Sequence, residues 1–300
     1  MQNSAFATAG LIERNCPMTT TLQDFTKTKA YLICVDSDGC AMDTMNVKHK
    51  RCFGPCLVEE WGLQPWAEPI LARWDAVNLY TMTRGINRFK GLAIVLRAVD
   101  TRYTRIDGLD EFTAWAETAP ELSNAALAEA VTTAQGPCLA KALHWSQTLN
   151  AAIAALPEAE KKPFPGVAEG LAAAHAVADV AVVSSANREA VEEEGERCGL
   201  LGAVDVLCCQ DSGSKAACIA ALLGKGYAPN HVLMVGDAPG DRDAAHKNGV
   251  LFYPILVRHE AESWAKLAQN ALPSFMEGSY PCHEAMWEQD FEKNLGKADI

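Results

Sequence analysis

The sequence predicts an α/β fold, in which a parallel sheet is flanked by helices and carries a large helical insertion. Short apolar runs recur in the second half of the chain, and each ends in polar residues followed by a helical pattern. One similar run lies far upstream, and residues 46–164 after it contain no convincing strand. Because helices separate the predicted strands, we expect a parallel sheet with right-handed crossovers.

Composition narrows the functional classes. The chain has 300 residues and 49% apolar content, enough for a sizeable core in one large or two modest domains. The net charge of -12 and the pI near 5.1 argue against nucleic acid as the main partner, since such binding needs clustered Lys and Arg. No apolar run approaches the length of a membrane span, and the start lacks the pattern of a signal peptide.

The cysteines indicate a reducing compartment. The chain has 11 Cys, an odd number, without a CxxC pair and with several inside apolar runs. Reduced, buried thiols in a cytoplasmic protein are the expected state. Cys52 and Cys56 are four residues apart but have no companion His/Cys pair for zinc.

The stretch 31–44 organises the rest of the chain. Residues 31–35 form a short apolar run that predicts a buried strand, and Asp36 and Asp38 follow it directly. In open α/β sheets the chemistry lies past the carboxyl ends of the strands. Asp38-Gly39 alone is also a common turn sequence. A calcium loop does not fit, because its required Gly and Glu positions hold other residues.

Between this stretch and residue 164 the sequence predicts helices. Apolar residues recur there at three- and four-residue spacing, and Gly and Pro interrupt the segments. The expected helices are 57–61, 66–79, 87–99, 109–117, 125–134 and 137–156. Residues 46–164 are therefore long enough for a small domain of their own. At the start of the chain, residues 1–28 are polar and are expected to form an N-terminal extension.

Two cationic stretches of the insertion are candidates for substrate binding. Lys48 and His49 belong to a charged run that opens a helix, where a plain solvated face is an equal alternative. Arg84, Asn87 and Arg88 lie around Gly85, and two Arg with an Asn could hold an anionic or hydroxylated ligand. Surface Arg packed along their stems are the alternative.

Polar residues follow the downstream strands as well. The first expected strand begins at residue 179 or 180 and ends at 183, and the others are 204–208, 231–235 and 250–257. Ser184 and Ser185 follow the first and precede a helix, which suits an anion site, although helix capping is a common alternative. Lys215 begins a helix after the second, against the helix dipole, whereas its competitor Lys225 lies after that helix. Asp237 and Asp241 follow the third.

Side chains at these strand ends should meet at one edge of the sheet. The set contains two acids, a hydroxyl, a Lys and two more acids, which suits phosphoryl transfer with a metal ion. Buried carboxylates that cluster are costly unless a cation joins them, and Mg²⁺ prefers such oxygen ligands.

The chain resembles the haloacid dehalogenase (HAD) superfamily. The family's four motifs are DxD, Ser/Thr, Lys and GDxxxD, and they match Asp36-Ser37-Asp38, Ser184, Lys215 and Gly236-Asp237 to Asp241 in this order. The resemblance covers residues 29–45 and 165–257, and it implies a Rossmann-like core. It implies a C1-type helical cap for 46–164, which is long for that type. Cys40 and Ala41 depart from the residues that many members have.

The resemblance also implies a mechanism. Asp36 would attack phosphorus and form an aspartyl-phosphate, while Asp38 would serve as general acid and then as base. Ser184, Ser185 and Lys215 would bind the phosphoryl oxygens. Mg²⁺ would bind the Asp36 carboxylate, the Asp38 carbonyl oxygen and Asp237, with Asp241 close behind. The dehalogenase and phosphonatase branches lack an acid at the position of Asp38, so a phosphate monoester fits better.

We therefore expect a cytoplasmic, Mg²⁺-dependent phosphatase of a small phosphorylated metabolite, working as a monomer or homodimer without nucleic acid or membrane partners. A phosphomutase has the same residues and would need a bisphosphate activator. A phospho-ligand-binding module without turnover is the third possibility, although no catalytic motif residue is missing. Residues 258–300 are too aromatic for disorder and should form helices docked on the core.

Overall fold

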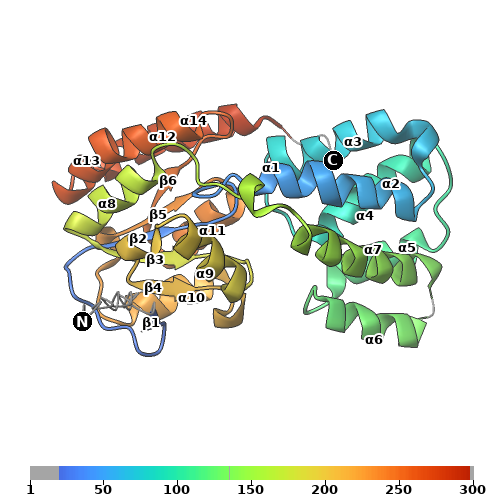
Figure 1. Cartoon of the computed structure of the whole chain (residues 1–300), viewed down its shortest axis with the longest axis horizontal. Helices are drawn as coiled ribbons and strands as arrows, with labels where there is room; N and C mark the ends of the chain where they lie inside the picture. The colour runs from blue at the N-terminus through green and yellow to red at the C-terminus, as the bar shows by residue number, and fades with distance from the viewer. Residues whose placement is uncertain (1–19, 135, 298–300) are drawn as a thin grey trace, which may run out of the picture.

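A single parallel sheet forms the centre of the larger lobe (Figure 1). The computed structural model describes residues 20–134 and 136–297. Its six strands have the order β1-β4-β3-β2-β5-β6, and every neighbouring pair is parallel. They are β1 (Thr20–Thr21), β2 (Leu32–Val35), β3 (Asp179–Val183), β4 (Val206–Cys208), β5 (Val232–Gly236) and β6 (Leu251–Pro254). The predicted α/β fold with a parallel sheet is confirmed.

Both faces of the sheet are covered, which explains why its strands are continuous apolar runs rather than alternating ones. Ile33 and Val35 of β2 join one hydrophobic cluster, while Leu32 and Cys34 join the cluster on the opposite face. Helices α8 (Val167–Val177), α12 (Glu260–Lys266) and α13 (Leu272–Met276) pack on the first face.

Other helices cover the second face and the β6 edge. Helices α10 (Lys215–Leu223) and α11 (Pro239–Asn248) contribute apolar residues to the second cluster. Helix α14 (Pro281–Leu295) lies beside β6, where Glu284 accepts a hydrogen bond from the Phe252 N–H over 2.7 Å. Helix α9 (Arg188–Arg197) follows β3. The C-terminal segment thus contains α12, α13 and α14, which pack on the sheet lobe.

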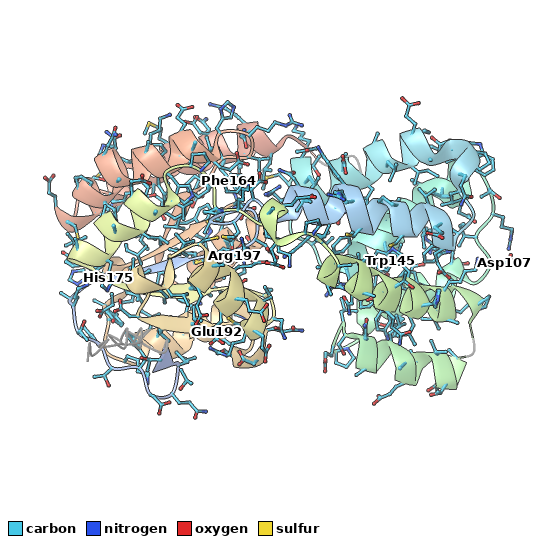
Figure 2. All side chains as sticks on the ribbon, in the orientation of Figure 1. Asp107, Trp145, Phe164, His175, Glu192 and Arg197 are labelled. Atoms are coloured by element: carbon cyan, nitrogen blue, oxygen red, sulfur yellow. The ribbon has the colours of Figure 1, made fainter. Side chains whose placement is uncertain are left out.

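The smaller lobe is helical and is inserted after β2 (Figure 1). Its helices are α1 (Met45–Lys48), α2 (Gly54–Glu60), α3 (Ala67–Asp75), α4 (Arg88–Arg102), α5 (Leu109–Thr118), α6 (Asn124–Ala134) and α7 (Pro137–Ala154). They enclose a hydrophobic cluster of their own. Trp74, Trp145 and Phe53 pack ring to ring within it, and Figure 2 places Trp145 on α7 inside this lobe. The predicted helical insertion is confirmed, whereas its domain boundaries stay a prediction.

Short helices of other types complete the elements. Three π-helical segments are η1 (His49–Phe53), η3 (Ala76–Tyr80) and η8 (Leu267–Ala271). The short 3₁₀ helices are η2 (Gln64–Trp66), η4 (Glu158–Glu160), η5 (Leu201–Ala203), η6 (Gln210–Ser212) and η7 (Pro229–His231). None of the helices in the described residues is long and apolar enough to cross a membrane.

Two chain segments that connect the lobes run side by side. The Asp43 N–H donates to the Lys162 carbonyl over 2.7 Å, and the Phe164 N–H donates to the Ala41 carbonyl over 3.0 Å. The insertion therefore leaves and re-enters the sheet lobe at one place, next to the end of β2.

The N-terminal residues differ from the sequence expectation where the structure describes them. Residues 1–28 were expected to be a loosely packed extension, and 1–19 lie outside the described part. Thr20 and Thr21 instead form edge strand β1 beside β4, and Phe25 is buried in the core. A two-residue strand has no periodicity by which it could be recognised, which is why the sequence did not predict it.

Candidate active site

The motif residues follow neighbouring strands of the sheet. Val35 of β2 is aligned with Val182 of β3 and with Val235 of β5. Asp36, Ser184 and Asp237 come just after these strands, so the topology places them at the same sheet edge. All three are buried. The Asp36 N–H donates to the Val235 carbonyl over 3.0 Å, which fixes the backbone at the start of the site.

Three carboxylates converge at this edge. Asp36, Asp237 and Asp241 each offer an oxygen, and these oxygens lie within 4.8 Å of one another. Lys215, from the first turn of α10, joins two of them: its Nζ is 2.9 Å from Asp36 Oδ1 and 2.5 Å from Asp241 Oδ1. Asp241 also accepts from the Ala238 N–H over 3.0 Å.

Burial and neighbouring charges set the ionisation of this group. Burial raises the pKa of Asp36 well above its ordinary value, Lys215 opposes the rise, and Asp241 and Asp237 add to it. Burial also raises the pKa of Asp237 to about 6, against the attraction of Arg84. The pKa of Lys215 is raised although burial alone would lower it, because Asp241 and Asp36 stabilise its cation.

Asp38 is separated from the three clustered carboxylates and has a different partner. Lys48 of α1 donates to both of its carboxylate oxygens, over 2.7 and 2.8 Å, and the Thr44 hydroxyl also donates to Oδ1. Burial would raise the pKa of Asp38, but Lys48 and then Thr44 lower it overall. Its carboxylate is not among the converging oxygens, so as a metal ligand it could offer only its carbonyl oxygen, as the resemblance implies.

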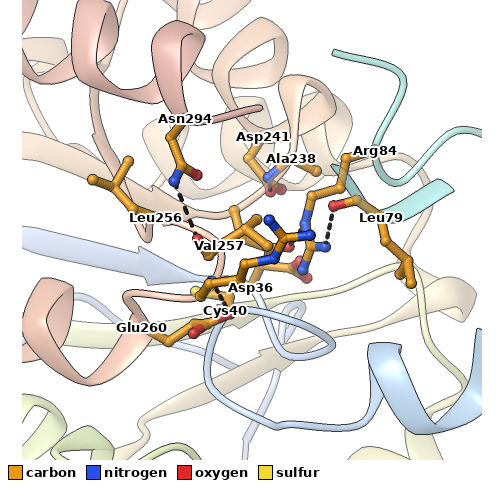
Figure 3. Close-up of polar contacts among 12 residues, drawn as sticks. Asp36, Cys40, Leu79, Arg84, Ala238, Asp241, Leu256, Val257, Glu260 and Asn294 are labelled. Carbon is orange, nitrogen blue, oxygen red and sulfur yellow. Dashed lines mark hydrogen bonds and ion pairs between the residues drawn. The ribbon is translucent and has the colours of Figure 1, made fainter. Parts of the chain in front are cut away.

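Arg84 reaches the same edge from the helical lobe. Its Nε lies 2.6 Å from Asp237 Oδ2, and the side chains are 0% and 1% exposed. Its Nη1 donates to the Leu79 carbonyl over 2.8 Å, a contact that Figure 3 shows beside Asp36 and Asp241. The sequence proposed Arg84 as a substrate-binding residue, and the structure places it against an acid of the core.

The two serines differ in their surroundings. Ser184 is buried after β3, and its Oγ accepts from the Ala186 N–H over 3.2 Å. Ser185 is exposed. The competitor Lys225 lies elsewhere, since its Nζ donates to the Gln23 carbonyl over 3.0 Å. Lys215 is therefore the lysine that the fold brings to the three carboxylates.

The remaining candidates for substrate binding have partners inside the helical lobe. His49 accepts from the Trp74 ring N–H over 3.0 Å and stacks on Phe53, and burial, with Arg84 nearby, lowers its pKa to about 3. Asn87 caps α4 by accepting from the Phe89 N–H.

Arg88 likewise points to neighbours in this lobe. It bonds Ser146 Oγ over 3.1 Å and Asn150 Oδ1 over 2.7 Å. The structure thus brings Lys48 and Arg84 to the site, but gives Asn87, Arg88 and His49 roles in packing the helical lobe.

Two residues near the site were missed by the sequence reading. Thr44 donates to Asp38, and its position shortly after the DxD stretch was the only available signal. Glu194 of α9 is buried close to Lys48 and Asp38, and burial raises its pKa. Its helix has no sequence pattern that distinguishes a buried Glu from the other acids around it.

The donor set fits a divalent cation that prefers oxygen ligands. Three buried carboxylates face two cationic side chains, Lys215 and Arg84. Asp237 Oδ1 is buried without a hydrogen-bond partner, which is costly unless a ligand satisfies it. Carboxylate oxygens at one point are the ligands that Mg²⁺ takes in proteins.

A comparison with protein-family models agrees with the resemblance that the motifs indicate. The family model of haloacid dehalogenase-like hydrolases matches residues 112–255, which include Ser184, Lys215, Asp237 and Asp241. No match was found among curated protein sequences.

Solved structures of low identity also match. A haloacid dehalogenase-like family hydrolase from Streptococcus pneumoniae is 13% identical with a TM-score of 0.45, over 78% of this chain and 90% of that one. A predicted phosphoglycolate phosphatase from Haemophilus somnus is 18% identical with a TM-score of 0.43, over 76% and 85%. A HAD-superfamily hydrolase of subfamily IA from Geobacter sulfurreducens is 13% identical with a TM-score of 0.38, over 76% and 90%.

The parallel sheet with its inserted helical cap places the candidate site at the carboxyl edge of the sheet. Over residues 112–255 the chain is similar to the haloacid dehalogenase-like hydrolases. Below, the helical lobe is called the cap and the sheet lobe the core.

Proposed function

We propose that the protein is a Mg²⁺-dependent phosphatase that hydrolyses a small phosphorylated metabolite through an aspartyl-phosphate. The observation that carries the proposal is the convergence of Asp36, Asp237 and Asp241 around Lys215, with Asp38 two residues after Asp36 on the same loop. Such a set can hold a phosphoryl group, neutralise its charge and supply a nucleophile.

Asp36 and Asp38 carry the two chemical steps. In the first, an Asp36 carboxylate oxygen attacks phosphorus, the bond from phosphorus to the leaving oxygen breaks, and Asp38 gives that oxygen a proton. In the second, Asp38 takes a proton from water, and the water oxygen attacks phosphorus, which releases phosphate and restores Asp36.

Other groups bind and orient the phosphoryl group. The Lys215 cation and the Ser184 hydroxyl hold the phosphoryl oxygens in this proposal. Asp36, Asp237 and Asp241, together with the Asp38 carbonyl, would hold Mg²⁺, whose charge offsets that of the phosphoryl group. Lys48 bonds Asp38, the acid that faces the leaving oxygen, so it is the cap-side candidate for contact with the rest of the substrate.

The test is phosphate release from a panel of phosphorylated metabolites, with Mg²⁺ and with a chelator. We expect Mg²⁺-dependent release by the wild type and its loss in Asp36→Asn. Asp43→Asn is the matched control, because Asp43 is exposed and lies on the same loop. Release that survives in Asp36→Asn would show that another residue is the nucleophile, and release from no compound would contradict the phosphatase.

A further inference from the structure

The most unusual contact of the site is made by the cap. Arg84 lies in the segment between η3 and α4, yet its buried Nε is 2.6 Å from Asp237 Oδ2 of the core. Its Nη1 bonds the Leu79 carbonyl of its own segment. An arginine with one edge fixed to its own backbone and the other edge fixed to a carboxylate is held in a single orientation.

Two glycines make room for this arrangement. A Cβ on Gly39 would lie 2.5 Å from Arg84 Nη2 and 2.6 Å from Asp237 Oδ2, so any side chain there would displace the pair. A Cβ on Gly85 would lie 2.9 Å from the Ala238 Cβ. Both glycines have positive φ, which also favours Gly. At Gly85 the cap segment therefore lies too close to the loop after β5 for a side chain to fit between them.

The segment is also fastened to the C-terminal part of the core. The Met82 N–H donates to the Gly296 carbonyl over 3.3 Å, and the Arg258 guanidinium lies 4.1 Å from the centre of the Tyr80 ring. Asn294 donates to the Val257 carbonyl over 3.1 Å, as Figure 3 shows. The contacts of Tyr80 and Met82 lie shortly before Arg84 on the chain and hold its segment against the core, while the Asn294 bond joins two parts of the core that they touch.

The two oxygens of Asp237 are not equivalent. Oδ2 accepts from Arg84, whereas Oδ1 is buried and has no hydrogen-bond partner. Asp36 and Asp241 share Lys215, whereas Asp237 pairs with an arginine of the cap. The pair thus fixes one oxygen and leaves the other for a ligand from outside the chain.

We propose that Arg84 is a positioning residue of the metal site. It holds Asp237 Oδ2 and thereby turns Oδ1 toward the cation, so that a cap residue orients a core metal ligand. This inference rests on the proposed function, because it takes the three carboxylates as the Mg²⁺ site. It predicts that metal affinity depends on a residue that does not itself bind metal.

The opposite role is competition, in which the Arg84 cation occupies Asp237 in place of the metal. The two roles predict opposite changes when Arg84 is replaced. Competition predicts tighter metal binding, since one positive charge is removed from the acids. Positioning predicts weaker binding, since Asp237 loses the contact that orients it.

The experiment measures Mn²⁺ binding by electron paramagnetic resonance of the free ion, without substrate, for wild type, Arg84→Gln and Arg84→Lys. We expect Arg84→Gln to weaken binding roughly 10- to 100-fold, the usual cost of losing a residue that orients a metal ligand. Arg84→Lys keeps the charge without the two-edged geometry and should fall between the two. Arg105→Gln is the control, because Arg105 is an exposed arginine of the cap.

The outcomes separate this inference from the proposed function. Equal or tighter binding by Arg84→Gln overturns positioning, and wild-type binding by Arg84→Lys overturns the need for the guanidinium geometry. If Arg84→Gln does not fold, as judged by thermal unfolding in chelator, the Mn²⁺ affinity of Arg84→Lys alone tests the positioning role. A wild type that binds no Mn²⁺ overturns the metal site of the proposed function, and this inference with it.

Discussion

Asp36 and Asp38 are two residues apart but lie in opposite electrostatic surroundings. Burial, with Asp241 and Asp237 nearby, raises the pKa of Asp36 against the pull of Lys215. Burial acts on Asp38 too, but Lys48 and Thr44 outweigh it and lower its pKa. Lys48 of the cap therefore favours the ionised form of Asp38, which is the form that takes the proton from water in the proposed mechanism.

Replacing Lys48 with Met should move the acidic limb of the pH–rate profile to higher pH. The pair lowers the pKa of Asp38, so its loss raises that pKa, and less Asp38 is ionised at any given acidic pH. The kcat on p-nitrophenyl phosphate, whose good leaving group makes the water step limiting, should follow this ionisation. Lys90→Met is the control on an exposed cap lysine. An unchanged acidic limb would contradict the role of the pair.

Among the residues of the site, the sequence predicted the acids better than the cationic residues that pair with them. Asp36, Asp237 and Asp241 could be found because each follows an apolar strand at a short, fixed distance. The partner of Asp237 is Arg84, 153 residues earlier in the chain, and no local pattern encodes a contact between cap and core. The same holds for Lys48, whose charge was equally compatible with a solvated helix face.

Among the secondary-structure elements, the strands that are buried on both faces of the sheet could be predicted from the sequence, whereas the short edge strand could not. Strands β2 and β5 are apolar throughout, because helices cover both sides of the sheet. Strand β1 is two threonines, and its place beside β4 comes from tertiary packing. The π-helical segments η1 and η3 lie within stretches of helical periodicity, so the sequence indicated helix without the change of helix type.

The N-terminal segment is tied to the sheet by one buried acid. Asp179, the first residue of β3, accepts from the N–H groups of Thr28 and Lys29, each over 2.9 Å. The Thr28 and Tyr227 hydroxyls donate to it as well. Burial alone would raise the pKa of Asp179, but these hydrogen bonds lower it overall.

We expect Asp179→Ala to reduce the free energy of unfolding by about 3 kcal/mol near neutral pH, because several buried donors lose their acceptor. A carboxylate whose pKa is lowered in the folded state stabilises the fold above its unfolded pKa, and this contribution is lost as the pH falls through the lowered value. The difference between wild type and variant should therefore narrow in acid. Urea unfolding near neutral pH and in acid measures this difference in the free energy of unfolding.

Asp107→Asn provides the comparison for this experiment, because Asp107 is an exposed acid at the far end of the cap in Figure 2. It should match the wild type at both pH values. An Asp179→Ala variant as stable as the wild type would show that the donors find other acceptors. A difference that stays constant into acid would show that the ionised form is not what stabilises the fold.

The whole molecule has two hydrophobic interiors joined by a narrow connection. One cluster lies within the cap, and the other apolar clusters lie against the sheet. The sequence predicted this division because strand patterns stop for the length of the insertion and then resume. It could not predict how the lobes meet. The ion pairs Arg84–Asp237 and Lys48–Asp38 each join a cap residue to a core residue, and the local sequence patterns of helices and strands do not encode such contacts.

Paired cavity substitutions should reveal whether these interiors unfold separately. Leu92 is fully buried in the cap cluster and Leu233 in a cluster on the sheet, so replacing either with Ala should cost about 3 kcal/mol locally. In hydrogen exchange followed by mass spectrometry, Leu92→Ala should speed exchange in α4, α5 and α7 while β2 and β5 keep their protection, because few contacts cross between the lobes. Leu233→Ala should open the sheet and leave the cap helices protected. Equal acceleration in both lobes for both variants would instead mean that the buried pairs at the site, Arg84–Asp237 above all, couple cap and core into one cooperative unit.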